Sequence, residues 1–460
     1  MPASDQLELS QKRLYRSLKE ELKFLEIASS REIQTYEKNF HRSLPKKIVA
    51  ADKKALLKAV ARARVILVGD FHPFRQSQKG FLRLLADARV HYPRIAVALE
   101  CVQQSQQKAL DNFGAGFITA EELREEINFD KEWPFPWPHY REILEYSRLN
   151  SLPLVALNVN KRGQNLLRDR DEAAAQQLAE TASTLPHHRI FVLYGELHLG
   201  APHLPGALRQ FFSPSSKLLV VHQNESSIYW RAPRLKSGAR AEVIKLRDNE
   251  FCVLNSVPWV KLKSYLDWIE GSDGDGEWGP DTSLHSLVIQ FANLLGETLG
   301  SPADILEKVE VIGPDSLSSR HTFSSEEMRL LRHSRDFQRV NYLPVADTIL
   351  LPSSSTNAIS EAASLLLWRS STTKSKAAPD GGSRLVMAFL VGFLGSKILN
   401  PKRKCNEVRD MKIFLSPGNR RPRTKIEAKK SLVFRRALRI IDQILSGKPI
   451  SGRPIAPLLE

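Results

Sequence analysis

The stretch Val65–Pro73, VILVGDFHP, decides how the first half of this chain folds. Its first four residues are apolar and predict a short buried strand. The glycine that follows has no Cβ and tolerates a sharp turn, and the closing proline cannot donate to a sheet ladder. Asp70 and His72 lie between these two residues. We therefore expect two polar side chains directly after a buried strand.

The same pattern, an apolar strand followed by Gly-x-x-His, recurs at Ile190–His198, with Glu196 inside the second tetrapeptide. Between the two copies, a third apolar strand at residues 95–99 ends in Glu100. Parallel strands end at the same edge of a sheet, and ligands of open α/β sheets bind at that carboxyl edge. We therefore expect His72, Glu100 and His198 to meet there.

Strand-like and helix-like segments alternate with short connections through this half of the chain. Further apolar runs at Leu154–Leu157 and Leu218–Val221 predict core strands, and Ile228–Arg231 is predicted as an antiparallel edge strand. This alternation is typical of an open, mostly parallel sheet flanked by helices. After it, amphipathic patterns such as Asn357–Trp368 and the apolar run Leu385–Asn400 predict an all-helical C-terminal region.

Composition and pattern divide the chain into four predicted parts: an N-terminal helical arm at 1–49, an α/β domain at 50–232, a helical domain with a linker at 233–400 and a basic tail at 401–460. The tail holds 16 Lys and Arg against 5 Asp and Glu, so it carries +11 of the net charge of +16. This excess indicates an anionic partner for the tail, a nucleic acid or an anionic lipid surface. The alternative is a solvated surface.

Three cysteines, Cys101, Cys252 and Cys405, lie far apart, which argues against a disulfide framework or a zinc knuckle. The first 26 residues lack the apolar core of a signal peptide. The longest apolar run, Leu385–Leu394, is shorter than the roughly 20 residues of a membrane span. We therefore expect a cytoplasmic protein without a transmembrane segment. The oligomeric state is left open.

The residues expected at the sheet edge are compatible with two chemistries. His72, Glu100 and His198 are the ligand types of an open divalent-metal site, which would activate a bound water. Alternatively, one histidine acts as a general base that Glu100 orients, with Asp70 and Glu196 as further acidic candidates. The structural alternative is that these side chains only satisfy backbone donors near helix N-termini.

The run Lys131–Pro138 contains three prolines and three aromatic residues. Prolines at this density exclude a regular helix and a central strand. We therefore expect a fixed loop over the same sheet edge, either as one wall of a ligand pocket or as a hydrophobic plug.

Two Gly-x-x-His motifs with an intervening strand-end glutamate resemble the superfamily that joins Tiki proteases, TraB, erythromycin esterases and the ChaN haem-binding proteins. The ChaN branch is the most similar, because it has a proline-aromatic run like residues 133–137, a Tyr-Arg pair like Tyr140-Arg141 and a strand that closes like the one ending in Asn158. Asp70 stands where ChaN relatives usually have Glu. The known ChaN proteins are bacterial envelope lipoproteins, whereas no export signal is predicted here.

The ChaN resemblance implies binding of haem or iron. Haem needs an apolar slot, an axial ligand and cations for its propionates. The candidates are Trp133, Phe135 and Trp137 for the slot, His139 or Tyr140 as axial ligand, Lys161 and Arg162 for the propionates, and Arg141 and Asn158 from the matched pattern. The other branches imply a metal- or His-assisted hydrolase instead. A non-catalytic interaction scaffold is the third interpretation, so the sequence leaves open whether the protein is an enzyme.

Overall fold

The computed structural model describes residues 3–25, 31–160, 166–212, 218–235 and 240–271, and shorter pieces after them, chiefly 310–312, 340–343, 348–351, 356–372 and 390–398. The chain divides into two compact units: Glu21–Ile269, and Met1–Glu20 together with Glu270–Glu460. The candidate site lies wholly in the first of them.

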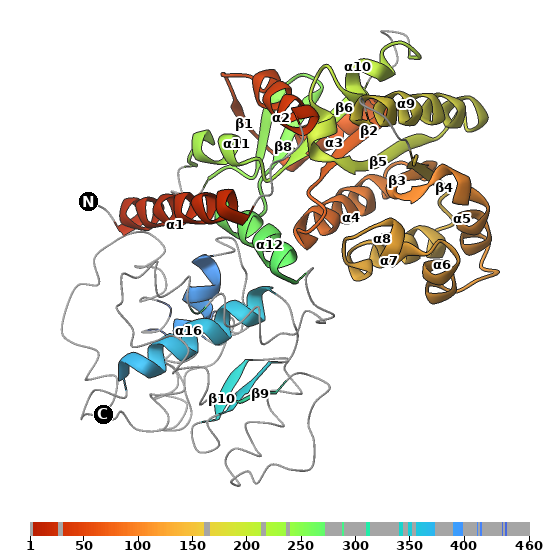
Figure 1. Ribbon diagram of the computed structural model, residues 1–460. Coiled ribbons are helices and arrows are strands. Elements are labelled where there is room, and N and C mark those ends of the chain that lie inside the picture. The colour runs from red at the N-terminus through yellow and green to blue at the C-terminus, as the bar shows by residue number, and fades with distance from the viewer. Residues whose placement is uncertain are drawn as a thin grey trace. The chain divides into compact units, whose positions relative to one another are not determined.

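An eight-stranded open sheet forms the centre of the unit 21–269 (Figure 1). Its strand order is β1-β7-β8-β6-β2-β5-β3-β4. The strands are β1 (Val49–Ala51), β2 (Val65–Asp70), β3 (Ile95–Gln103), β4 (Leu154–Asn158), β5 (Arg189–Gly195), β6 (Leu218–Gln223), β7 (Val243–Arg247) and β8 (Glu250–Val253). From β8 to β4 every neighbouring pair is parallel, whereas β7 pairs antiparallel with both β8 and β1. The predicted open, mostly parallel sheet is confirmed, and it also takes in strands that follow residue 232.

Helices cover both faces of this sheet. They are α2 (Arg31–Ser43), α3 (Lys53–Arg62), α4 (Arg75–Arg89), α5 (Gln107–Gly114), α6 (Ala120–Glu126), α7 (Phe129–Glu132), α8 (Trp137–Leu149), α9 (Leu166–Thr184), α10 (Leu204–Leu208), α11 (Ser226–Arg231) and α12 (Pro258–Gly271), with 3-10 turns η1 (Gln104–Gln106) and η2 (Glu196–Leu199).

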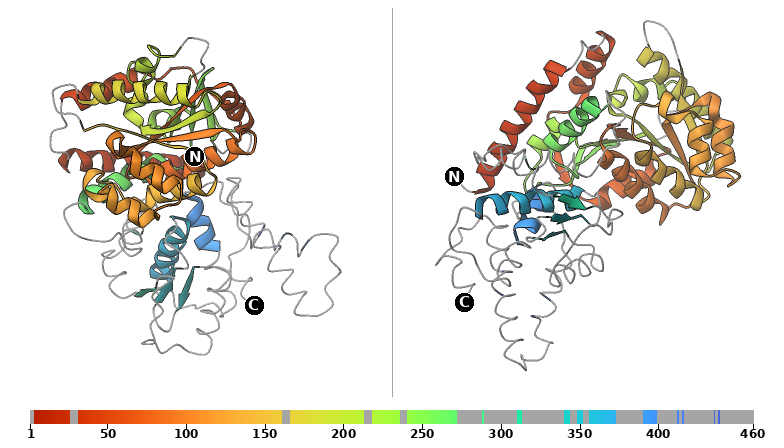
Figure 2. Two further views of the ribbon diagram at one scale, coloured as in Figure 1. Left: turned by 90° about the vertical axis from the view of Figure 1, so that its right-hand side faces the viewer. Right: turned by 60° about the horizontal axis from the view of Figure 1, so that its bottom comes forward.

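The alternation of side chains along β2 separates two cores. Ile66 and Val68 pack with α3, α4, α5 and α8, whereas Val65 and Leu67 pack with α9 and α10. Figures 1 and 2 show these two helical layers on opposite sides of the sheet. A strand buried on both faces explains why the decisive stretch is a continuous apolar run.

The second unit contains a small sheet of order β10-β11-β9, formed by Glu310–Ile312 (β9), Asn341–Leu343 (β10) and Thr348–Leu350 (β11). The predicted helix at 357–368 is confirmed as α16 (Thr356–Thr372), and residues 390–398 are helical within the predicted Leu385–Asn400. The N-terminal helix α1 spans Ala3–Leu25. Most of the basic tail and the other predicted helices lie outside the described residues. Among the described helices, none is both long and apolar enough to cross a membrane.

The predicted edge strand at Ile228–Arg231 is wrong, because these residues form helix α11. The carboxylate of Glu225 accepts a hydrogen bond from the N–H of Ser227 and so caps the helix start (3.0 Å). Ile228 then turns fully into the core. A side-chain cap and one buried anchor therefore outweigh the β-propensity of the aromatic residues that follow.

Candidate functional site

Both Gly-x-x-His motifs and the strand-end glutamate come together at the carboxyl edge, because β5 lies between β2 and β3. Gly195, the last residue of β5, marks the meeting point. A Cβ on Gly195 would lie 3.2 Å from Oε2 of Glu100, 3.3 Å from Nε2 of His72 and 3.3 Å from Cδ2 of His198. These three side chains therefore converge on Gly195, where an added Cβ would be in tight contact with all of them.

Asp70, at the end of β2, organises the first half of this cluster. Its Oδ2 hydrogen-bonds Nδ1 of His72 (2.9 Å) and accepts the hydroxyl of Tyr140 (2.9 Å). Its Oδ1 accepts Nε2 of Gln78 (2.5 Å). The carboxylate is almost fully buried, so these bonds are what satisfy it. They hold the His72 ring with Nε2 directed at Glu100, 3.8 Å from Oε2.

Glu100, at the end of the apolar part of β3, is locked between a cation and a backbone donor. Its Oε1 pairs with Nη2 of Arg170, and its Oε2 accepts the N–H of Gly195 (2.5 Å). The Glu100 side chain is 2% exposed and that of Arg170 is 23% exposed. The charge of the glutamate is thus compensated inside the protein and not by water.

His198 belongs to a second carboxylate–histidine pair on the other side of Gly195. Its Nδ1 lies 2.7 Å from Oδ1 of Asp171, and Oδ2 of the same carboxylate accepts the hydroxyl of Tyr36 (3.0 Å). Asp171 and His198 are both buried. The site therefore contains two histidines that are each oriented through Nδ1 by a carboxylate.

Charge interactions in this cluster outweigh the cost of burial. Burial alone would lower the pKa of His72, but the charge and hydrogen bond of Asp70, together with Glu100, raise it above its ordinary value. Burial would raise the pKa of Glu100, but Arg170, followed by His72 and His198, lowers it. Glu100 is therefore ionised at neutral pH, with the guanidinium of Arg170 as its cationic partner.

The cluster meets only part of what a divalent metal requires. His72 and His198 have the Nδ1–carboxylate contacts that orient metal-bound histidines. Glu100, however, already binds the guanidinium of Arg170, which a cation would have to displace. Within the described part of the chain, no group of three or more His, Cys, Asp or Glu side chains is arranged to hold a metal ion. The carboxylate therefore does not fit the predicted metal site.

The proline-aromatic run lies against His72, beside the same sheet edge. The rings of Trp133 and Phe135 both pack on the His72 ring, with centroids 4.7 Å away. Phe135 also contacts Trp268 of α12 (4.9 Å), whose indole N–H donates to the carbonyl of Pro134 (2.8 Å). Trp137 is instead buried in the core against Phe129.

The remaining candidates from the matched pattern lie in different surroundings. Tyr140 is 1% exposed, and its hydroxyl is used by Asp70. His139 is half-buried, with Nδ1 at 3.4 Å from the carbonyl of His72. Arg141 points to the surface, where it pairs with two glutamates of α6 and α8, and Asn158 bonds the N–H that follows it in the chain. Lys161 and Arg162 lie outside the described residues.

Glu196, from the second tetrapeptide, is engaged in an ion pair with α12. Nζ of Lys261 lies 2.7 and 2.6 Å from its two carboxylate oxygens. The same Nζ stands over the ring of Phe71, 4.6 Å from its centroid. Through this ion pair, Glu196 anchors the first turn of α12.

Sequence reasoning missed Arg170, Asp171 and Gln78, which supply the partners of Glu100, His198 and Asp70. Arg170 and Asp171 occur in a polar, Ala-rich helix that has the pattern of a surface helix. The signal that would have drawn attention to them is an adjacent Arg-Asp pair in the first turns of a helix after a strand end. That signal becomes specific only when the sheet order is known.

The match to one protein-family pattern agrees with the motifs. Residues 56–196 match the sequence pattern of a family described as haem-binding uptake, Tiki superfamily, ChaN. A solved structure on cofacial haem binding to ChaN of Campylobacter jejuni is similar, with 16% identity, 45% of this chain and 94% of that chain covered, and a TM-score of 0.32. The structure of the type III effector HopBA1 is similar at 12% identity, with 45% of this chain and 96% of that chain covered and a TM-score of 0.31. No curated protein matches the chain. Residues 56–196 are thus identified, by the sequence pattern that they share with it, as a ChaN-like segment of the Tiki superfamily.

Proposed function

We propose that the α/β unit binds haem at the carboxyl edge of its sheet, with His139 as the axial ligand. The observation that carries this proposal is the state of His139. Burial lowers its pKa to about 4, so the imidazole is neutral at physiological pH. A neutral imidazole is the form that coordinates iron.

The contacts of His139 favour the tautomer that an axial ligand needs. Nδ1 lies 3.4 Å from the carbonyl of His72 and, as the protonated nitrogen, donates to it. Nε2 then keeps its lone pair and has no partner among the described residues. Tyr140, the other axial candidate, donates its hydroxyl to Asp70, and burial followed by the charge of Asp70 raises its pKa. A phenolate at Tyr140 is therefore unfavourable.

The surroundings supply an aromatic platform and one cation. Phe135, Tyr265 and Trp268 form a partly exposed aromatic group, in which the last two rings stack with centroids 5.8 Å apart. Lys79 on α4 has a lowered pKa because of burial and then of Arg75, so a carboxylate ligand beside it would be stabilising. Haem bound here would supply the iron, while the chain supplies the imidazole, the ring contacts and the propionate partner.

Haem titration followed by absorption spectroscopy tests this proposal. We expect His139→Ala to weaken binding at least about tenfold and to remove the spectral signature of histidine ligation, since the change deletes the ligand. His91→Ala is the matched control, because His91 is exposed elsewhere, and Tyr140→Phe should leave the spectrum unchanged. An unaltered spectrum and affinity in His139→Ala would contradict the assignment.

The Asp70–His72 pair favours a second candidate function, His-assisted hydrolysis. Asp70 fixes the ring through Nδ1, and Nε2 is directed at Glu100 beside Gly195, where it would take a proton from a water. Arg170, bound to Glu100, is placed to stabilise negative charge near the same point. This arrangement supplies a base and a cation without a metal ligand set.

Hydrolysis of p-nitrophenyl acetate, measured across pH, tests the second candidate. We expect His72→Gln to lower the rate about 100-fold or more, as for loss of a general base. The wild-type rate should rise as pH passes through the raised pKa of His72, because only the neutral ring is a base. Asp70→Asn should shift that rise to lower pH. A rate that depends on added metal and is abolished by a chelator would contradict this mechanism.

A further inference from the structure

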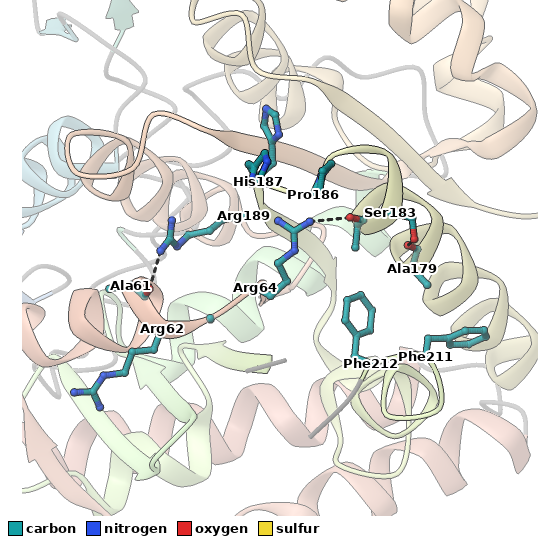
Figure 3. Close-up of a pocket in the computed structure, with 13 residues that line it drawn as sticks. Ala61, Arg62, Arg64, Ala179, Ser183, Pro186, His187, Arg189, Phe211 and Phe212 are labelled. Atoms are coloured by element: carbon teal, nitrogen blue, oxygen red, sulfur yellow. Dashed lines mark hydrogen bonds between the residues drawn. The ribbon is translucent and has the colours of Figure 1, made fainter. Parts of the chain in front are cut away.

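The amino edge of the sheet, at the opposite ends of β2 and β5 from the His72 cluster, carries a separate cavity of about 590 Å³ (Figure 3). It is lined by the end of α3, the start of β2, the last turn of α9, the start of β5 and the segment after α10. Its basic lining residues are Arg62, Arg64, Arg189, His187 and His188, and among the described residues no Asp or Glu lines it.

The two arginines at the centre are fixed by neutral acceptors. Nη2 of Arg64 donates to the carbonyls of Ala182 (2.9 Å) and Leu185 (2.7 Å). Nη2 of Arg189 donates to the carbonyl of Ala61 (2.7 Å), and its guanidinium lies 4.0 Å from the ring centroid of Tyr92. Neither arginine pairs with a carboxylate among the described residues. Both cations are thus held in place while their charges remain uncompensated.

Burial and neighbouring positive charges lower the pKa values of two lining residues. Burial, and then the charge of Arg189, lowers the pKa of Arg64. Burial, and then Arg64, Arg94 and His187, lowers that of His188. In the described part of the chain, Nδ1 of His188 and Nε of Arg189 are buried without a hydrogen-bond partner. An anion in the cavity would neutralise charges that the described residues leave unmatched.

The remaining wall is apolar. Phe211 and Phe212 line the cavity together with alanines of α3 and α9, and Phe211 is 49% exposed although it is a large hydrophobic residue. We propose that this cavity binds a small phosphate monoester that carries an aromatic group. Arginine forks bind phosphate oxygens bidentately, and the phenylalanines offer the ring a stacking surface. The proposal is independent of haem binding, which concerns the other edge of the sheet.

Calorimetric titration with phenyl phosphate and with inorganic phosphate tests the charge contribution. We expect Ser183→Glu to weaken phenyl phosphate binding at least about tenfold, because it adds a carboxylate at an exposed lining position. Gln176→Glu makes the same charge change on an exposed part of α9 outside the lining and should have little effect. Arg64→Gln should weaken binding as Ser183→Glu does, with folding checked by circular dichroism.

The apolar contribution has its own test. Phenyl phosphate should bind at least about tenfold more tightly than inorganic phosphate, and Phe211→Ser should remove this advantage while leaving inorganic phosphate binding unchanged. Equal affinity for the two probes in the wild type, or wild-type affinity in Ser183→Glu, would overturn the proposal.

Discussion

Replacing Arg170 by leucine should reduce the free energy of unfolding of the α/β unit by about 3–5 kcal/mol at neutral pH. The change removes the cation bound to Oε1 of Glu100 and leaves a 2% exposed carboxylate with one backbone donor, the N–H of Gly195. A buried charge that has lost its partner is among the most destabilising single changes. Hydrogen exchange of the amides of β3 and β5 in the full-length chain measures the loss within this unit.

The effect of Arg170→Leu should depend on pH in a defined direction. In the wild type, the lowered pKa of Glu100 contributes stability above the unfolded pKa of a glutamate, and this contribution is lost as pH falls through the folded pKa. Without Arg170 the folded pKa rises, so Glu100 of the variant takes up a proton at higher pH. The stability difference between wild type and variant should therefore be largest near pH 7 and shrink toward pH 4.

Arg168→Leu is the matched control for this experiment. Arg168 lies on the same helix, with a side chain that is 72% exposed and paired with Glu172. Loss of such a surface ion pair should leave the free energy of unfolding almost unchanged. Equal losses in Arg168→Leu and Arg170→Leu, or a difference that does not change with pH, would show that Glu100 does not depend on its buried partner.

The residues that could be predicted are those whose chemistry follows a strand locally. Asp70, Glu100 and His198 each follow an apolar run within four residues, and a parallel sheet brings the carboxyl ends of its strands to one edge. The sheet class follows from the same runs, because strands buried on both faces have continuous apolar sequences. The short-range sequence patterns predict parallel strands, and parallel strands bring the motif residues together at one edge of the sheet.

The partners of these residues could not be predicted, because they depend on which helix passes over which strand end. Arg170 and Asp171 have the composition of a solvated helix surface, yet they neutralise Glu100 and orient His198. Trp137 lies in a proline-aromatic run that is typical of a pocket wall, yet its side chain at the start of α8 is buried in the core. Side-chain direction around a helix depends on tertiary packing, and proline-rich entry segments give no periodicity from which to infer it.

Replacing Lys261 by methionine should also cost about 3–5 kcal/mol in the free energy of unfolding. Its ammonium group binds both oxygens of Glu196 and lies near the charge of Glu225, so the variant leaves two carboxylates without their shared cation. Burial would lower the pKa of Lys261, but these glutamates raise it. Burial also raises the pKa of Glu196, although the ammonium group of Lys261 opposes this shift. Because Lys261 anchors α12, hydrogen exchange in residues 258–269 should increase most.

A second substitution separates the ion pair from the packing of α12. Adding Glu196→Leu to Lys261→Met removes the stranded carboxylate as well, so the double variant should recover part of the lost stability, since an apolar pair tolerates burial better than a lone charge. Lys58→Met, at an exposed position of α3, should change stability by less than about 0.5 kcal/mol. If the double variant were less stable than Lys261→Met, Glu196 would have structural contacts that do not depend on Lys261. The rate of p-nitrophenyl acetate hydrolysis in Glu196→Gln separately tests the catalytic role that its tetrapeptide suggests.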